Sequence, residues 1–76
     1  MDYESWMLQA KQKISQLPVD KSFSLRELFD EANWNTLSKG ERQGFGRFFR
    51  NEVTDNKVDG VVYLMKSSAV LYKKNR

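Results

Sequence analysis

The sequence predicts a small α+β domain made of three helices and a short antiparallel sheet. Three observations indicate this class. Apolar residues recur at helical spacing in the first part of the chain, two capping-box signatures mark helix starts in the middle, and two β-rich runs lie near the end. Because the chain has only 76 residues, we expect one domain, residues 1–76, around a single small core. The sequence contains neither cysteine nor histidine.

The first helix is expected over residues 3–17. Its apolar stripe has steps of three and four and consists of Tyr3, Met7, Ala10, Ile14 and Leu17. Pro18 should end this helix, because a proline ring disfavours helical geometry in the residue before it. Trp6 lies close to the stripe, and packing explains it better than a ligand role, since a small core needs large side chains.

A short extended connection, residues 19–24, leads to the second helix, which is expected over residues 25–32. Phe23 should anchor the connection, with room for one short strand. Ser24 and Glu27 form a capping box, in which the two side chains satisfy amide groups of the first helical turn. The side chains expected to face inward are Leu25, Leu28 and Phe29. The following linker, residues 33–37, should bury its two large apolar residues, Trp34 and Leu37.

The third helix is expected over residues 38–53 and has an aromatic face. Ser38 and Glu41 repeat the capping box and fix where this helix begins. The residues that gather on one side at helical spacing are Phe45, Phe48, Phe49 and Val53. This spacing favours core packing over stacking on single-stranded bases, with Phe48 at the edge of the core.

The other side of the third helix is basic and polar. Arg47 and Arg50 are three residues apart and can project together, and Gln43 precedes Arg47 by one turn. Guanidinium groups suit phosphate and guanine edges, and a glutamine can contact an adenine edge or a phosphate. Arg42 is ambiguous: it either joins this face or bonds within the fold. The acids of the second helix with which it could pair are Glu27, Asp30 and Glu31.

Gly44 and Gly46 each oppose helix formation by about 1 kcal/mol relative to alanine. Something should offset that cost. Close packing of another helix or of Trp34 is one explanation, and close approach of a DNA backbone is the alternative. The stretch lacks the spacing of a dinucleotide-binding fingerprint and follows no expected strand, so we expect no cofactor.

The end of the chain predicts a β-hairpin. Residues 61–65 and 69–73 form the two β-rich runs, and residues 66–68, beginning with Lys66, form the turn between them. Gly60 marks a bulge or turn before the first run. The basic tail, residues 73–76, is expected to fray.

The expected order of elements, helix, short strand, helix, turn, helix and hairpin, resembles a winged helix-turn-helix domain. In most domains of that kind, the third helix enters the major groove of DNA and the hairpin, called the wing, touches the nucleic acid nearby. The resemblance therefore assigns residues 38–53 to recognition and the turn at Lys66 to the tip of the wing.

A second resemblance covers about two-thirds of the chain. It begins at Phe23, and the residues that carry it are Phe23, Leu25, Leu28, Phe29, Trp34, Leu37, Gly40, Arg42, Gly46, Phe49, Val53 and Tyr72. Their spacing is similar to that of a family of short bacterial and phage proteins classed as a domain of unknown function. The resemblance implies a bacterial or mobile-element setting and carries no activity.

The positive charge is concentrated in the second half of the chain. Residues 1–38 carry four basic and six acidic side chains, whereas residues 39–76 carry nine basic and four acidic ones, so the net charges are −2 and +5. This asymmetry suggests a polyanion or an acidic partner for the second half, and a basic solvated surface explains it equally well from charge alone. Together with the expected order of elements, it predicts a small protein that binds double-stranded DNA. The predicted contact residues are Lys39, Gln43, Arg47, Arg50, Asn51, Lys66 and Lys73.

A protein-interaction module that modulates a host or phage protein without binding DNA is the alternative hypothesis. Exposed Trp6, Tyr63 or Tyr72 would favour it, since exposed aromatic residues anchor interfaces. Without histidine or cysteine, and without a persuasive pair of carboxylates, we expect neither enzymatic activity nor a metal. No apolar run is long enough to span a membrane, so the chain is expected to be cytoplasmic. The sequence leaves open whether the chain forms a homodimer.

Overall fold

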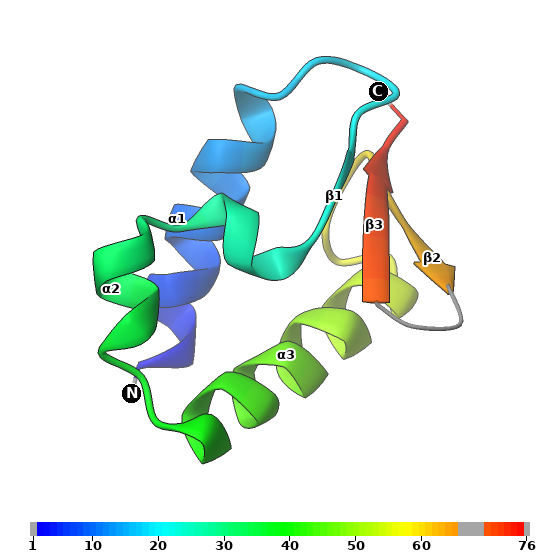
Figure 1. Ribbon diagram of the computed structural model, residues 1–76. Coiled ribbons are helices and arrows are strands. Elements are labelled where there is room, and N and C mark those ends of the chain that lie inside the picture. The colour runs from blue at the N-terminus through cyan, green and yellow to red at the C-terminus, as the bar shows by residue number, and fades with distance from the viewer. Residues whose placement is uncertain (1, 66–69, 76) are drawn as a thin grey trace.

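Three α-helices and a three-stranded antiparallel sheet form the structure, a computed structural model that describes residues 2–65 and 70–75 (Figure 1). The helices are α1 (Tyr3–Ser15), α2 (Glu31–Asn35) and α3 (Lys39–Thr54), with a short 3-10 helix, η1 (Leu25–Leu28), before α2. The strands are β1 (Ser22–Phe23), β2 (Val61–Met65) and β3 (Val70–Lys74). The predicted α+β class is therefore confirmed.

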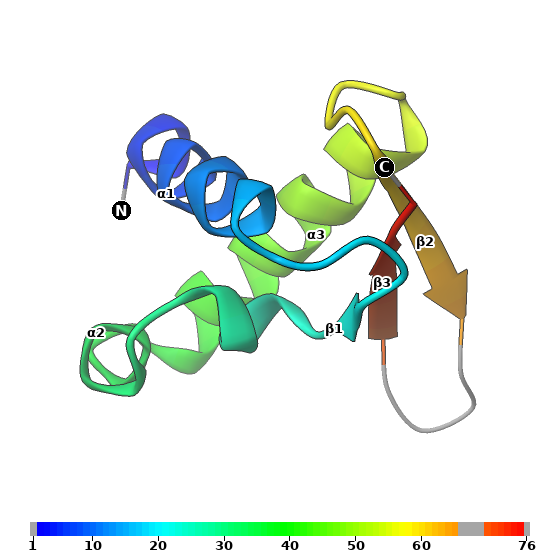
Figure 2. The same ribbon diagram turned by 90° about the horizontal axis from the view of Figure 1, so that it is seen from above.

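The sheet has the strand order β1-β3-β2, so the last strand lies in the middle. Tyr72 of β3 is the residue at which both pairings meet, because it lies opposite Phe23 on β1 and opposite Tyr63 on β2. Seen from above, α1 and α2 lie at one side of the molecule and the strands at the other, and α3 extends between them (Figure 2). This layout brings the middle of α3 close to β3.

The first helix is two residues shorter than predicted. Asp2 caps its start by accepting hydrogen bonds from the amides of Glu4 and Ser5, at 3.1 and 3.4 Å. After Ser15 the chain tightens into a turn that ends at Pro18, as expected from the restriction that a proline imposes on the preceding residue. Lys74 forms hydrogen bonds with the backbone at this end of the helix. Its ammonium group donates to the carbonyl oxygen of Leu17 at 2.7 Å.

The single second helix predicted over residues 25–32 is wrong. The structure has η1 and α2 in its place, separated by Phe29 and Asp30, and the backbone of Phe29 is extended. The cause is Asp30, whose carboxylate accepts from the amide of Ala32 at 3.1 Å and starts a new helix. The predicted linker, residues 33–37, is consequently half helical. Its two large residues are buried as predicted, Trp34 at 8% and Leu37 at 7% exposure.

The third helix begins where the sequence predicts. The backbone amide of Ser38 donates to the Glu41 carboxylate at 2.9 Å, and the amide of Glu41 donates to the Ser38 hydroxyl at 3.1 Å. These two bonds confirm the second capping box. The inward residues also match the predicted stripe, since Phe45, Phe49 and Val53 are buried and Phe48 is half-buried at the edge of the core.

The core has two parts joined by partly buried side chains. The larger part brings α1, β1, η1, α3 and the hairpin together and includes Met7, Ala10, Ile14, Phe23, Leu28, Phe49, Val53, Val58, Val61 and Tyr72. The smaller part lies under α2 and consists of Trp34, Leu37 and Phe45. Three half-buried residues pack against both parts, namely Leu25, Phe29 and Phe48.

The predicted hairpin is present, and its second strand ends at Lys74, one residue later than expected. Gly60 has a positive φ of 76°, which confirms a turn at the position where glycine is favoured. The predicted turn at residues 66–68 lies outside the described residues. The expectation that the tail frays from residue 73 is wrong for Lys73 and Lys74, because both belong to β3. The backbone of Lys74 bonds to that of Lys21 and Asp20.

Candidate functional site

The exposed face of α3 carries the basic and amide side chains that the sequence indicated. Lys39, Gln43, Arg47 and Arg50 are all exposed, and at about 100° per residue they fall within an arc of about 80°. Asn51 is also exposed and lies just beyond that arc. The two glutamates of α3 project from the opposite half of the helix. The arc therefore presents positive charge without a neighbouring carboxylate on the same helix.

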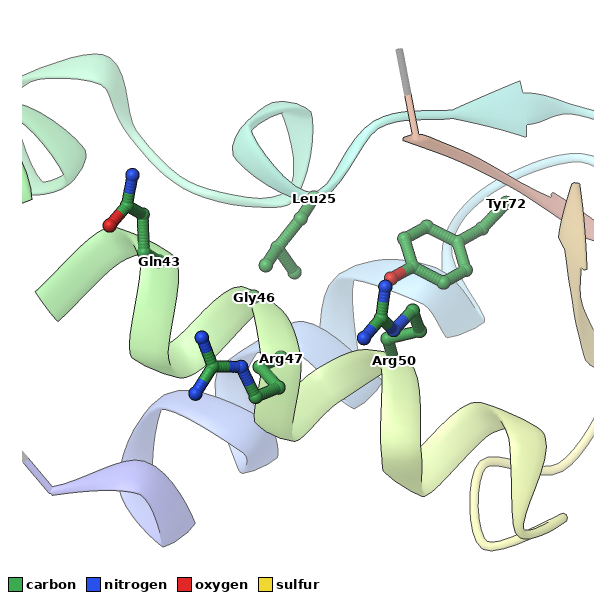
Figure 3. A pocket seen from close by; sticks show the side chains of 6 residues that line it. All are labelled: Leu25, Gln43, Gly46, Arg47, Arg50 and Tyr72. Atoms are coloured by element: carbon green, nitrogen blue, oxygen red, sulfur yellow. The ribbon is translucent and has the colours of Figure 1, made fainter. Parts of the chain in front are cut away.

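Part of this face forms one wall of an open groove of about 330 Å³ (Figure 3). The groove is lined from three elements: Leu25 on η1, Tyr72 on β3, and four residues of α3, which are Gln43, Gly46, Arg47 and Arg50. None of the described lining residues is acidic. Three predicted site residues, Gln43, Arg47 and Arg50, which span about two turns of α3, are thus brought together with two side chains from elsewhere in the chain.

Gly46 leaves the backbone of α3 uncovered inside this groove. A Cβ atom built at this position would have nothing within 4 Å, so no packing contact accounts for the glycine. Gly44 differs, because a Cβ atom there would lie 2.5 Å from the hydroxyl oxygen of Tyr3 on α1. Close packing against another helix, one of the two explanations drawn from the sequence, therefore applies to Gly44 and not to Gly46.

Tyr72 reaches the groove from the middle strand of the sheet. Its ring is only 2% exposed and packs edge-on against Phe49 of α3, with the ring centres 4.8 Å apart. Burial raises the pKa of Tyr72 to about 12, the neighbouring Tyr63 adds to this rise, and Arg50 opposes it. Figure 3 shows the tyrosine hydroxyl directed toward the Arg50 guanidinium. The hydroxyl is therefore neutral at physiological pH and lies in the field of a cation.

The structure does not bring every predicted residue to the groove. Lys39 and Asn51 lie on the exposed part of α3 outside it. Lys73 lies on the other face of the sheet, because side chains alternate along a strand and Tyr72 faces α3. Its ammonium group is 3.6 Å from the Asp20 carboxylate. Lys66, the predicted tip of the wing, lies outside the described residues.

Arg42 is half-buried and is not among the residues that line the groove. Among the described residues it has no ion pair, so the predicted pairing with Glu27, Asp30 or Glu31 is not formed. Its Nε atom is buried without a hydrogen-bond partner in that part of the chain. The side chain thus contributes to the interior side of α3 rather than to its exposed face.

Sequence reasoning missed three lining residues, Leu25, Gly46 and Tyr72. Leu25 and Tyr72 come from elements far apart in the chain, and only their packing places them beside α3. Gly46 did carry a signal, since a glycine inside a helix is unfavourable unless something requires it.

Within residues 2–65 and 70–75, no helix is both long and apolar enough to cross a membrane. The same residues contain no group of three or more acidic, histidine or cysteine side chains suited to a metal ion.

A family model matches residues 8–74, which is nearly the whole chain. The chain belongs to the DUF1413 family, described as a domain of unknown function. This DUF1413 domain thus includes all the residues that line the groove. Comparisons with curated proteins and with solved structures gave no significant match.

Proposed function

We propose that this DUF1413 protein binds double-stranded DNA, with α3 as the recognition helix and the β2–β3 hairpin as the wing. The observation that carries the proposal is the exposed face of α3, where Lys39, Gln43, Arg47 and Arg50 project together while the two glutamates of this helix lie on its opposite half. The proposal includes a non-enzymatic role, a cytoplasmic location and a bacterial or mobile-element setting.

The arrangement of elements supports this proposal. A helix, a short strand, two further helices and a hairpin follow one another, and the last strand lies between the other two. Winged helix-turn-helix domains have the same order. In them the third helix is free on one side, and the major groove of B-DNA, about 12 Å wide, admits a helix of that diameter.

The side chains on this face have the chemistry that DNA requires. Arg47 and Arg50 offer paired donors that remain charged at any working pH and fit phosphates or the O6 and N7 atoms of guanine. Gln43, one turn earlier, offers both a donor and an acceptor, as an adenine edge requires. Each phosphate that a basic side chain neutralises should release counterions, which makes binding sensitive to salt.

A double charge reversal tests the proposal. Replacing Arg47 and Arg50 with glutamate should abolish the mobility shift of a mixed-sequence DNA duplex, while the circular dichroism spectrum stays unchanged because both side chains are exposed. For the wild-type protein, the logarithm of the affinity should fall with the logarithm of salt concentration, with a slope of about −0.9 per phosphate contacted.

A matched control distinguishes the loss of the α3 side chains from the change in the net charge of the protein. Lys11 and Lys13 are exposed on α1, and replacing both with glutamate changes the net charge by the same amount. This control should weaken binding only slightly. Equal loss in the two double variants would contradict a recognition role for α3, and an unaltered shift in the arginine variant would do the same.

The alternative of a protein-interaction module lacks the observation that would favour it. Tyr72 is buried, while Trp6 and Tyr63 are half-buried and pack against other aromatic rings. None of the three is the exposed anchor expected of an interface residue. If the wild-type protein fails to shift DNA at low salt, the interaction module becomes the leading hypothesis.

A further inference from the structure

The hydroxyl group of Tyr72 lies at the groove with no protein partner. Its ring is 2% exposed and held by Phe49, Phe23 and Tyr63, yet the hydroxyl forms no hydrogen bond with any described residue. Among the described residues, only Nε of Arg42 is a buried side-chain polar atom without a partner, so the Tyr72 hydroxyl oxygen itself opens to the groove. The hydroxyl is therefore placed to donate a hydrogen bond to a group that enters the groove from outside the chain.

The surroundings of that hydroxyl select for an anion. Arg50 lies beside it and Arg47 lines the same groove, and a guanidinium group has five donors and no acceptor. The raised pKa of Tyr72 keeps its proton in place, so the hydroxyl is available as a donor. Gly46 directly precedes Arg47, lies about one turn before Arg50, and leaves space where a side chain would otherwise project.

A second hollow on the other side of η1 provides a comparison. It is lined by Arg26 together with Glu27 and Glu31, so positive and negative groups are mixed there. The groove beside α3 has no acidic lining among the described residues. Its volume, about 330 Å³, lies at the lower end of the range of roughly 300–1,000 Å³ for ligand sites. That is sufficient for a phosphate and part of its sugar.

We propose that this groove is a phosphate subsite in which the Tyr72 hydroxyl and the Arg50 guanidinium bind oxygens of the same phosphate group. The tyrosine donates one hydrogen bond and the guanidinium donates further bonds while neutralising charge. The phosphate approaches over Gly46. This inference rests on the proposed function in taking the phosphate from the DNA backbone, and a free phosphate compound offers the same chemistry.

Tyr72→Phe is the central test, because it removes only the hydroxyl and keeps the ring that packs on Phe49. DNA affinity, measured by fluorescence anisotropy, should fall about tenfold, the effect of a lost hydrogen bond to a charged group. The slope of affinity against salt should stay unchanged, because the hydroxyl carries no charge. Arg50→Gln should instead reduce that slope by about 0.9, since one phosphate is no longer neutralised.

The double variant shows whether the two side chains bind the same phosphate. If they do, adding Tyr72→Phe to Arg50→Gln should weaken binding less than it does in the wild-type background. Additive losses would overturn the shared-phosphate assignment. The melting temperature of Tyr72→Phe should equal or exceed that of the wild type, because the hydroxyl has no protein partner to lose.

Tyr63→Phe is the matched control. Tyr63 lies opposite Tyr72 on β2 and is not among the residues that line the groove. The same chemical change at this position should leave DNA affinity unchanged. Equal weakening in both phenylalanine variants would overturn the proposal, since it would indicate a general effect on the sheet.

Titration with inorganic phosphate separates the subsite from the proposed function. In NMR spectra at constant ionic strength, phosphate should shift the Gly46 amide signal of the wild type but not of Tyr72→Phe. If DNA does not bind and this shift is seen, the subsite stands and serves a free phosphate compound. If DNA binds and Tyr72→Phe behaves like the wild type, the subsite is wrong and the proposed function stands. Absence of both signals overturns both.

Discussion

The two faces of α3 differ in how completely the rest of the fold covers their side chains. On the inward face, Phe45 and Phe49 have no exposed surface and contact other aromatic rings. On the outward face, Gln43, Arg47 and Arg50 surround a groove that no side chain of the fold occupies. Packing within the fold accounts for the first face. It leaves the open shape of the second face unexplained, and the proposed phosphate subsite would account for that shape.

The two internal glycines show the same contrast within three residues of sequence. Gly44 is covered by Tyr3, whose ring also packs on Phe48 with the ring centres 5.0 Å apart. Gly46 has nothing within 4 Å of the position where its Cβ atom would lie. One glycine is therefore required by the fold, whereas the other is kept at a cost to helix stability. Positions of the second kind are candidates for function.

The largest expected effect comes from the inward face. Phe49→Ala should lower the free energy of unfolding by about 3–5 kcal/mol, because it removes a completely buried ring and leaves a cavity. That is a large part of the roughly 5–15 kcal/mol that stabilises a typical domain. Urea denaturation followed by circular dichroism measures the change, and Phe49→Leu provides a milder variant if the alanine variant does not fold.

The matched change on the outward face is Asn51→Ala. Asn51 is exposed, so the free energy of unfolding should change by less than about 0.5 kcal/mol. A loss comparable to that of the phenylalanine variant would mean that the outward face takes part in packing. The contrast between the two faces would then be wrong.

Local signals in the sequence predicted most of the fold. The period of the apolar residues, the capping box at Ser38 and Glu41, and the two β-rich runs gave α1, α3 and the hairpin to within a few residues. The second helix was misjudged because Asp30 has a dual character: it continues a helical pattern, but its carboxylate also caps a new helix. Only the surrounding packing decides between these two roles.

The candidate site was predictable only in part. Gln43, Arg47 and Arg50 share a face because they lie on one helix, and the helical period is a local property. Tyr72 and Leu25 join them through the order of the strands and the break before α2, which are tertiary features. Lys73 was included on charge alone, and the alternation of side chains along β3 places it on the other face of the sheet.

A medium effect is expected from alanine at the two glycines. Gly46→Ala should raise the free energy of unfolding by about 0.5–1 kcal/mol, since alanine favours the helix and meets no clash. Gly44→Ala gains the same preference but displaces Tyr3 from its place against Phe45 and Phe48. Thermal denaturation should therefore rank Gly46→Ala above Gly44→Ala, and equal stabilities would contradict the difference between these positions.

The smallest effect concerns the capping box that sets where both faces of α3 begin. The hydrogen bond from the Ser38 backbone amide, followed by one involving the Ser38 side chain, lowers the pKa of Glu41 from its usual 4.5. A carboxyl group with a lowered pKa in the folded state stabilises the fold above about pH 4.5, and this contribution is lost as the pH falls through the folded-state value. Glu41→Gln should therefore reduce the loss of stability between neutral and acidic pH, measured by urea denaturation at a series of pH values.

Asp55→Asn at the other end of α3 is the control and should leave that part of the profile unchanged, since only the start of the helix depends on the Glu41 carboxylate. A Glu41→Gln profile identical to that of the wild type would mean that the hydrogen bonds of the cap do not depend on charge, and that the polar start of α3 owes its stability to geometry alone.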